Sequence, residues 1–200
     1  QQVMLPDDWS VGIVMTLIGN PKRWYLCMDR TNWKIGKSDV NILMLAVVTE
    51  RYRVPLMWTF LSHSGNSTTQ QRIALMQRYL ARFNASSVRM FLADREFIGQ
   101  EWFKFLKEHS IPFAIRVKEE QLIVVDGREY SLRSYLSRCK GERDFTATLP
   151  AKAGQPALEL HFGAKRIKGG ELLIVACSEP LRGKRILRYY RWRWFIECMF

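Results

Sequence analysis

The sequence predicts an α/β protein whose single mixed sheet is flanked by helices. Three consecutive apolar segments have strand character, and two amphipathic helical patterns then alternate with two further strands. Three strands with short connections form an antiparallel meander, whereas a strand that follows a crossover helix lies parallel to its partner in the same sheet. The predicted order is therefore strand, strand, strand, helix, strand, helix, strand.

The first three strands are predicted at 24–29, 41–49 and 54–61. Aromatic and apolar groups fill the first of them, and the polar run that begins with Asp29 is expected to end it. A strand at 88–93 is likewise followed by a carboxylate, Asp94. Both aspartates are thus expected at the carboxyl ends of buried strands.

The two helices are predicted from residues that repeat at helical spacing. Ser67 or Thr68 can cap a helix that runs to about Phe83. Its expected apolar stripe consists of Ile73, Met76, Leu80 and Phe83. The second helix covers 98–109, and a fifth strand follows at 112–117. Its inward-facing side chains are expected to be Trp102, Phe105 and Leu106.

The remainder of the chain divides into a β-rich segment and a closing helix. Residues 1–117 are predicted to form the first part of the core, 118–178 a β-rich insertion, and 179–200 the return to the core. The expected strands of the insertion are 122–125, 144–149, 158–162 and 172–176, with a turn at 126–127. The closing helix is expected over 186–200.

Amino-acid composition and net charge limit the classes of function that the protein can have. A net charge of +12 among 200 residues is typical of a protein that binds nucleic acid, although an anionic membrane or solubility alone would also explain it. The four cysteines are far apart and no histidine stands at zinc-site spacing, which argues against a structural zinc site. No apolar stretch is long enough to cross a bilayer, and we expect a cytoplasmic protein.

The closing helix presents an acid beside a cation and a phenol. Tyr190, Arg193 and Glu197 stand at i, i+3 and i+7, which places them on one helical face. If the strands that carry Asp29 and Asp94 are neighbours, Glu197 can meet both aspartates. Three clustered carboxylates require a cation, and oxygen-only ligands suit Mg²⁺ or Mn²⁺.

These motifs resemble those of DDE transposases encoded by bacterial insertion sequences. The three segments are Leu26 to Trp33, Leu92 to Phe97, and Tyr190-x2-Arg193-x3-Glu197. They look like the group with a Tyr-x2-Arg-x3-Glu-x6-Lys signature, which has a ribonuclease H-like core and a β-strand insertion before the last acidic helix. The family lysine would fall beyond Phe200.

The resemblance implies that Asp29, Asp94 and Glu197 are the catalytic, metal-binding triad, and that Tyr190 and Arg193 contact DNA. Two Mg²⁺ or Mn²⁺ ions roughly 4 Å apart can activate a water or a DNA 3′-hydroxyl and stabilise the leaving oxygen. The implied partners are double-stranded DNA, at transposon ends and target, and a second copy of the protein in a synaptic complex. The alternative for Arg193 is an ion pair with Glu197.

Other candidate DNA contacts come from residues beside these motifs. Arg30 and Arg95 each follow a triad aspartate and either orient it, touch phosphate, or are plain surface arginines. Lys165 and Arg166 lie in a basic hairpin tip that either tracks the DNA backbone or is a solvated turn. Trp194 and its neighbour Trp192 can stack on a base, but at least one of the two is expected in the core.

Two alternatives to a transposase remain open on the sequence. One is a non-catalytic DNA-binding module of ribonuclease H-like shape, and the other is a nuclease without strand transfer. The chain begins without methionine and ends three residues after Glu197 inside a helical pattern. We therefore expect a fragment, and expect activity of the full-length protein rather than of this piece.

Overall fold

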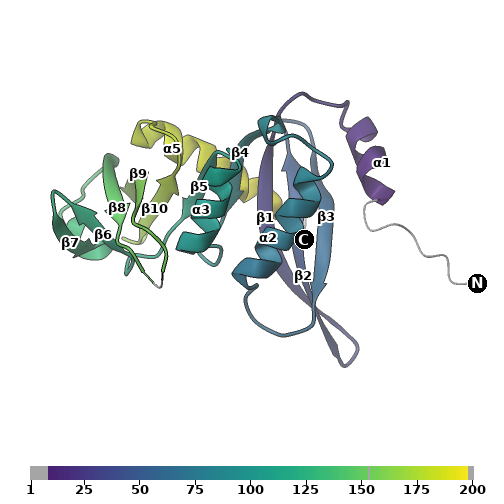
Figure 1. The fold of residues 1–200 in the computed structure, drawn as a ribbon, viewed down its shortest axis with the longest axis horizontal. Helices are drawn as coiled ribbons and strands as arrows, with labels where there is room; N and C mark the ends of the chain where they lie inside the picture. Colours follow the sequence, from purple (N-terminus) through teal and green to yellow (C-terminus); the bar gives the residue numbers. More distant parts are fainter. Residues whose placement is uncertain (1–8, 153, 198–200) are drawn as a thin grey trace, which may run out of the picture.

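A computed structural model of the chain describes residues 9–152 and 154–197, except for the side chains at positions 35, 38 and 197. Its strands form one ten-stranded sheet in the order β3-β2-β1-β4-β5-β10-β9-β8-β6-β7. Helices cover both faces of the half that contains β1 to β5 (Figure 1). Within the described residues, no helix is long and apolar enough to span a membrane.

The first five strands form the predicted mixed sheet, in the ribonuclease H-like arrangement that the resemblance implied. β1, β2 and β3 are antiparallel neighbours, and β4 and β5 continue the sheet parallel to β1. Their bounds are Trp24–Ile35, Ser38–Val48, Arg53–Leu61, Val88–Ala93 and Phe113–Arg116.

The strand β1 is longer than predicted, so Asp29 does not end it. β1 pairs with β2 from Tyr25 opposite Val48 to its last residue, and Asp29 lies opposite Met44. The polar run after Asp29 continues as one arm of a hairpin that turns at Gly36, whose φ of 63° suits glycine. The parallel pairing of β1 with β4, however, stops at Met28 opposite Ala93. Asp29 therefore does lie at an edge, because the neighbouring strand β4 ends there.

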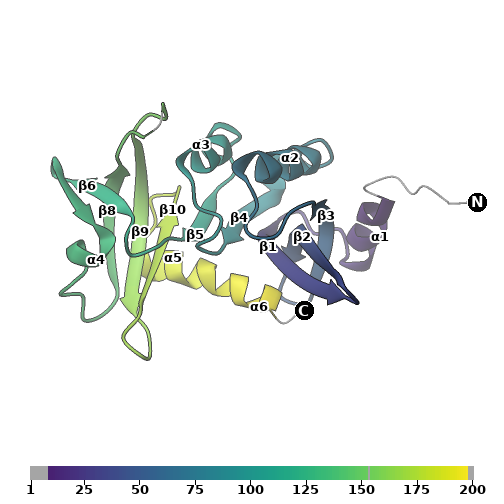
Figure 2. The same cartoon turned by 90° about the horizontal axis from the view of Figure 1, so that it is seen from below.

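Helices α2 and α3 cover one face of this half of the sheet, with α1 beyond them at its side (Figure 2). They span Thr69–Leu80, Gln100–Glu108 and Trp9–Leu17, and a short 3-10 helix, η1, spans Ala85–Ser87. Thr68 caps α2 through a capping box with Gln71, as predicted. The inward residues predicted for α3 are buried.

Two predictions about these helices were wrong in part. The stripe of α2 that packs inward is centred on Leu75, Met76 and Tyr79, and its other predicted members are only partly buried. The helix α1 was not predicted, because its apolar residues surround the helix rather than following one stripe; Leu17 is 68% exposed.

The segment 118–178 extends the same sheet. Its first strands, β6 and β7, form a hairpin whose turn at Asp126 and Gly127 has positive φ at both residues. β10 pairs antiparallel with β5 and so joins this half to the core. The strands β6 to β10 and the short helix α4 span Leu122–Val125, Arg128–Ser131, Arg143–Leu149, Leu158–Arg166, Leu172–Cys177 and Leu132–Tyr135. The division of the chain at 117 and 178 stays a prediction.

The closing helix lies on the opposite face of the sheet from α2 and α3 (Figure 2). It is not the uniform helix predicted over 186–200: α5, Gly183–Tyr190, continues through a 3-10 turn, η2, Arg191–Arg193, into α6, Trp194–Glu197. Residues 198–200 lie outside the described residues. The start of α5 sits directly on β9, since a Cβ on Gly163 would come within 2.9 Å of the Gly183 carbonyl oxygen. Gly163 thus permits this close approach to β9, and Gly183 permits one to β8, because a Cβ on Gly183 would lie 2.9 Å from the Arg143 carbonyl oxygen.

Candidate active site

The alternation of side chains along two neighbouring strands turns both aspartates toward the closing helix. On β1, Tyr25 and Cys27 pack on the closing-helix side of the sheet, so Asp29 follows on that face. On β4, Met90 and Leu92 pack on the same side. Asp94 continues that alternation one residue beyond the strand. Cys27 on β1 is a fully buried thiol.

The two carboxylates are held in the same way. The backbone amide of Arg30 donates to Asp29 Oδ1 at 2.9 Å, and the amide of Arg95 donates to Asp94 Oδ1 at 2.7 Å. Each remaining oxygen faces one guanidinium nitrogen, because Arg193 Nη2 lies 3.6 Å from Asp29 Oδ2 and 3.7 Å from Asp94 Oδ2. The two aspartates, 65 positions apart in sequence, therefore share one cation.

Tyr190 joins the same group from the helix side. Its hydroxyl donates to Asp94 Oδ1 at 3.3 Å. The 3-10 turn after Tyr190 brings it into line with Arg193, since side chains at i and i+3 eclipse in a 3-10 helix. Burial, and next the nearby Asp94 charge, raise the pKa of Tyr190, so the phenol stays protonated and acts as a donor.

The environment of Asp29 disfavours the ionised form of its carboxyl group. Only 14% of its side chain is exposed. Burial raises the pKa of the Asp29 carboxyl, while Arg193 and the Arg30 amide partly offset this, and the charges of Glu96 and Asp94 add to the rise. Burial of Asp29 therefore outweighs the stabilisation that Arg193 gives to its charged form.

Glu96 is a residue that the sequence analysis missed. It forms a two-point ion pair with Arg30, at 3.2 Å to Oε1 and 3.3 Å to Oε2. Arg30 also donates to the side chains of Asn32, Asn41 and Asn66. The spacing of Asp94 and Glu96, two residues apart just after a strand, is the signal that could have indicated a second acid near the site.

The predicted third acid, Glu197, is the last residue of α6, and its side chain lies outside the described residues. Among the side chains that are described, no three histidine, cysteine or acidic groups converge as a metal site. The oxygen donors of Asp29 and Asp94 nevertheless fit a hard divalent cation, because both already converge on one positive group. The predicted ion pair of Arg193 with Glu197 stays untested.

The family model described as "Transposase DDE domain" matches residues 20–200. The chain belongs to this family. The match covers both aspartates and the closing helix, and it indicates a nuclease or transposase activity on DNA. A search of curated proteins gave no match.

Two solved structures are similar over most of the chain. The NurA nuclease from Sulfolobus solfataricus aligns with a TM-score of 0.40 and 11% identity, over 84% of this chain and 72% of that one. The endonuclease V from Bacillus subtilis aligns with a TM-score of 0.36 and 10% identity, over 83% and 68%.

A groove of about 850 Å³ opens beside Asp94. One wall is the outer side of the closing helix, and the other comes from β5, β9 and β10. Two predicted DNA contacts line it: Lys165 on β9, and Trp194, which is 68% exposed. Its other basic lining residues are Arg116, Arg188, Arg191 and Arg193. The groove therefore combines a cationic wall with an exposed indole at the carboxylates.

The remaining predicted contacts are placed elsewhere. The guanidinium of Arg166 donates to the carbonyl oxygens of Ser137, Cys139 and Gly170, so it fastens the hairpin tip to the neighbouring loop. Arg95 is half exposed and pairs with Glu171 at 3.5 Å. Of the two closing-helix tryptophans, Trp192 packs against the core on that face, as expected of at least one of them.

Proposed function

We propose that this chain is the catalytic core of a DNA transposase that cleaves phosphodiesters at transposon ends and transfers the 3′-hydroxyl into target DNA. Asp29, Asp94 and Glu197 are its proposed acids. The observation that carries the proposal is the convergence of Asp29 Oδ2 and Asp94 Oδ2 on a single cationic nitrogen of Arg193. Two acids from neighbouring strands that meet at one positive charge form the core of a metal site.

The acids would hold two Mg²⁺ or Mn²⁺ ions, which when bound supply a nucleophile and stabilise the leaving oxygen of an in-line displacement. The chain's own contribution is orientation. The amides of Arg30 and Arg95 fix one oxygen of each carboxylate and leave the other oxygen facing the shared position. The ion pair between Arg30 and Glu96 in turn holds the backbone that presents Asp29.

Tyr190 and Arg193 are proposed to contact DNA phosphate. Both are donors that now face the carboxylates. Once a metal balances the acids, the same donors are free to hydrogen-bond phosphate oxygens, where a guanidinium is the preferred partner. Arg193 would therefore balance the acids before DNA binds and hold the substrate afterwards.

The groove beside Asp94 is the proposed path of the DNA. Lys165 and the helix arginines would contact the backbone, and Trp194 offers an exposed ring face to an unpaired base. Arg30 stays a proposed contact only through its exposed edge, because its guanidinium is already bound by Glu96 and three asparagines. A homodimeric synaptic complex of the full-length protein belongs to the same proposal, as does membership of the group with the Tyr-Arg-Glu-Lys signature.

The test is cleavage and joining by the full-length protein, with and without Mn²⁺. Substituting Asp29, Asp94 or Glu197 by alanine is expected to lower metal-dependent cleavage about a thousandfold or more, because several kcal/mol of metal catalysis is lost. DNA binding should persist. The matched control is Asp39→Ala, in which an exposed hairpin carboxylate is removed.

Each outcome separates the candidates. Cleavage that survives in all three alanine variants contradicts the site. A wild-type protein that binds DNA, but neither binds Mn²⁺ nor cleaves the DNA, is the non-catalytic module. A protein that cleaves DNA but fails to join a pre-cleaved end is a nuclease without strand transfer.

A further inference from the structure

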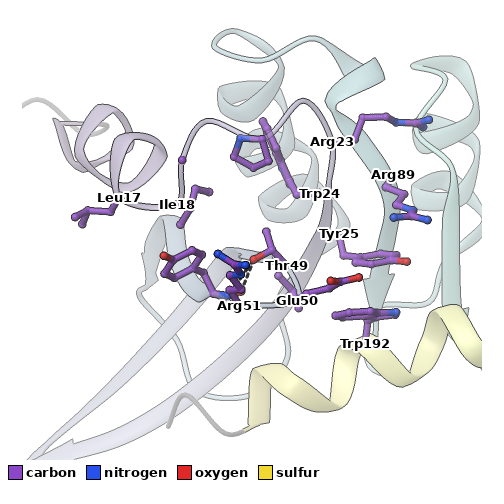
Figure 3. Close-up of a pocket in the computed structure, with 14 residues that line it drawn as sticks. Leu17, Ile18, Arg23, Trp24, Tyr25, Thr49, Glu50, Arg51, Arg89 and Trp192 are labelled. Carbon is purple, nitrogen blue, oxygen red and sulfur yellow. Dashed lines mark hydrogen bonds between the residues drawn. The ribbon is translucent and has the colours of Figure 1, made fainter.

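The closing helix has a second functional surface on the side away from the acids. Here a groove of about 350 Å³ is lined by Tyr25, Arg89, Arg185, Arg188, Tyr189 and Trp192. We call it the arginine–aromatic groove. It shares Tyr25, Arg89 and Trp192 with a neighbouring pocket of about 440 Å³ (Figure 3). Both hollows lie at the amino-terminal ends of β1 and β4, whereas Asp29 and Asp94 lie near the carboxyl end of β4.

Aromatic rings hold the arginines of this groove in place. Figure 3 shows the Tyr25 ring between Arg89 and Trp192: Arg89 Cζ lies 5.4 Å from the ring centroid, and the Trp192 ring stacks on it at 4.8 Å. Tyr25 in turn contacts Tyr189 at 6.0 Å, and Arg185 Cζ lies 5.7 Å from the Tyr189 centroid. Two guanidinium groups thus flank a cluster of three rings.

Within the described part of the chain, no ion pair joins the arginines of this groove, Arg89, Arg185 and Arg188, to an acid. All three are exposed. A guanidinium that rests its face on a ring keeps the N–H donors at its edge directed into solvent. The groove is therefore a set of oriented donors with uncompensated positive charge.

One acid limits where an anion can lie. Glu50 lines the neighbouring pocket and lies on the Trp192 side of Tyr25 (Figure 3). Burial is the main cause that raises the pKa of Tyr25, and the Glu50 charge adds to the rise, whereas Arg89 and Arg185 act to lower it. An anionic ligand is consequently favoured on the side of Arg89, Arg185 and Arg188 and disfavoured toward Glu50.

We infer that the arginine–aromatic groove binds the phosphodiester backbone of duplex DNA, as a second contact surface on the side of the closing helix away from the acids. The inference rests on the proposed function, which supplies the DNA. Tyr25 precedes Asp29 by four residues of strand, about 13 Å, which is about the rise of four base pairs at roughly 3.4 Å each. One duplex can therefore reach the acids and the groove together, on the two sides of the closing helix.

The test measures how DNA affinity depends on salt. Each arginine–phosphate contact contributes close to one unit to the slope of log affinity against log salt. The double variant Arg89→Ala with Arg185→Ala is expected to make this slope less steep by about two units for a 20-base-pair duplex of arbitrary sequence. Mn²⁺ binding should be unchanged. The charge-matched control is Arg128→Ala with Arg138→Ala, two exposed arginines in the far half of the sheet. Its slope should equal that of the wild type.

The outcomes separate this inference from the proposed function. Equal slopes for the groove variant and the wild type would overturn the groove alone, as would an equal loss in the control variant, which indicates a general charge effect. A wild-type protein that binds no DNA would remove the proposed function as well. Replacing both groove arginines by lysine keeps the charge, and that variant is expected to retain the slope; thermal unfolding confirms that each variant is folded.

Discussion

The two flanks of the closing helix use arginine in opposite ways. On the acid flank, Arg193 is buried and balances two carboxylates. On the other flank, Arg185 is exposed, rests on Tyr189 and has its hydrogen bond to that phenol. One helix therefore presents a neutralised cation to the acids near the carboxyl end of β4, and uncompensated cations to the amino-terminal ends of β1 and β4.

In the proposed function, this difference separates the metal-binding site from the second DNA-binding surface. A cation held between two acids can be exchanged for a metal ion, so it suits a site whose charge must change. Arginines that stack on rings have no carboxylate partner to give up, so they can attract phosphate whether or not a metal ion is bound.

Removing the shared cation should have the largest effect on stability. Arg193→Ala leaves two neighbouring carboxylates without their counter-ion, and breaking a buried pair in this way costs about 3 kcal/mol of unfolding free energy. Mn²⁺ should recover most of the loss, because a divalent cation can take the vacated position. Urea unfolding in EDTA and in Mn²⁺ measures both effects.

The matched control for that variant is Arg188→Ala, on the exposed side of the same helix, which should change stability by less than about 0.5 kcal/mol. If Mn²⁺ stabilises the wild type and Arg193→Ala by the same amount, Arg193 does not occupy the metal position.

A smaller loss is expected where the helix meets the sheet. A Cβ on Gly163 would lie 2.9 Å from the Gly183 carbonyl oxygen and 3.1 Å from the Ile186 side chain, so Gly163→Ala should cost about 2 kcal/mol through overpacking. Both flanks depend on this contact, since it sets where α5 starts. Gly141→Ala serves as the control, because nothing lies within 4 Å of its added Cβ. Equal melting temperatures for the two variants would show that α5 is not fixed by this contact.

The smallest effect concerns the charge of Asp29. The pKa of Asp29 is raised in the folded protein, so folding favours the protonated acid. This contribution to the stability of the folded protein is fully present below the ordinary pKa of 3.8, and it is lost as pH rises through the folded pKa. Asp29→Asn, which is neutral at every pH, should therefore exceed the wild type in metal-free stability at pH 7, by about 1 kcal/mol.

Denaturant unfolding in EDTA between pH 3 and pH 7 measures this difference, which should shrink toward low pH. The exposed Asp39→Asn serves as its control. A variant that is less stable than the wild type at pH 7, with no dependence on pH, would show that burial does not disfavour the charged form of Asp29.

The sequence predicted the sheet and the residues that meet on it, but not how they meet. Each aspartate follows an apolar strand segment, which indicated that the two acids share an edge if the strands are neighbours, and β1 and β4 are neighbours. The closing helix brings Tyr190 and Arg193 to these acids. The length of β1 was missed because Arg30 to Asn32 are polar, although the hairpin partner β2 supplies their backbone pairing. Local propensity does not reveal such tertiary pairing.

The details of the site depended on contacts that no local pattern contains. Arg166 lies in a segment with the composition of a basic hairpin tip, yet its guanidinium donates to three carbonyl oxygens of the segment 137–170. The arginine–aromatic groove brings together Tyr25, Arg89 and Arg185 from three elements, so no spacing in the sequence indicates it. The 3-10 turn at 191–193 alters the angular relation that a uniform helix would give.

The central claim is that Arg193 occupies the position of a metal ion between Asp29 and Asp94, and a crystal structure with Mn²⁺ tests it most directly. We predict anomalous density within about 2.2 Å of one oxygen from each aspartate, with the Arg193 guanidinium withdrawn from both. Density elsewhere, or none between them while Arg193 still contacts both carboxylates, would contradict it.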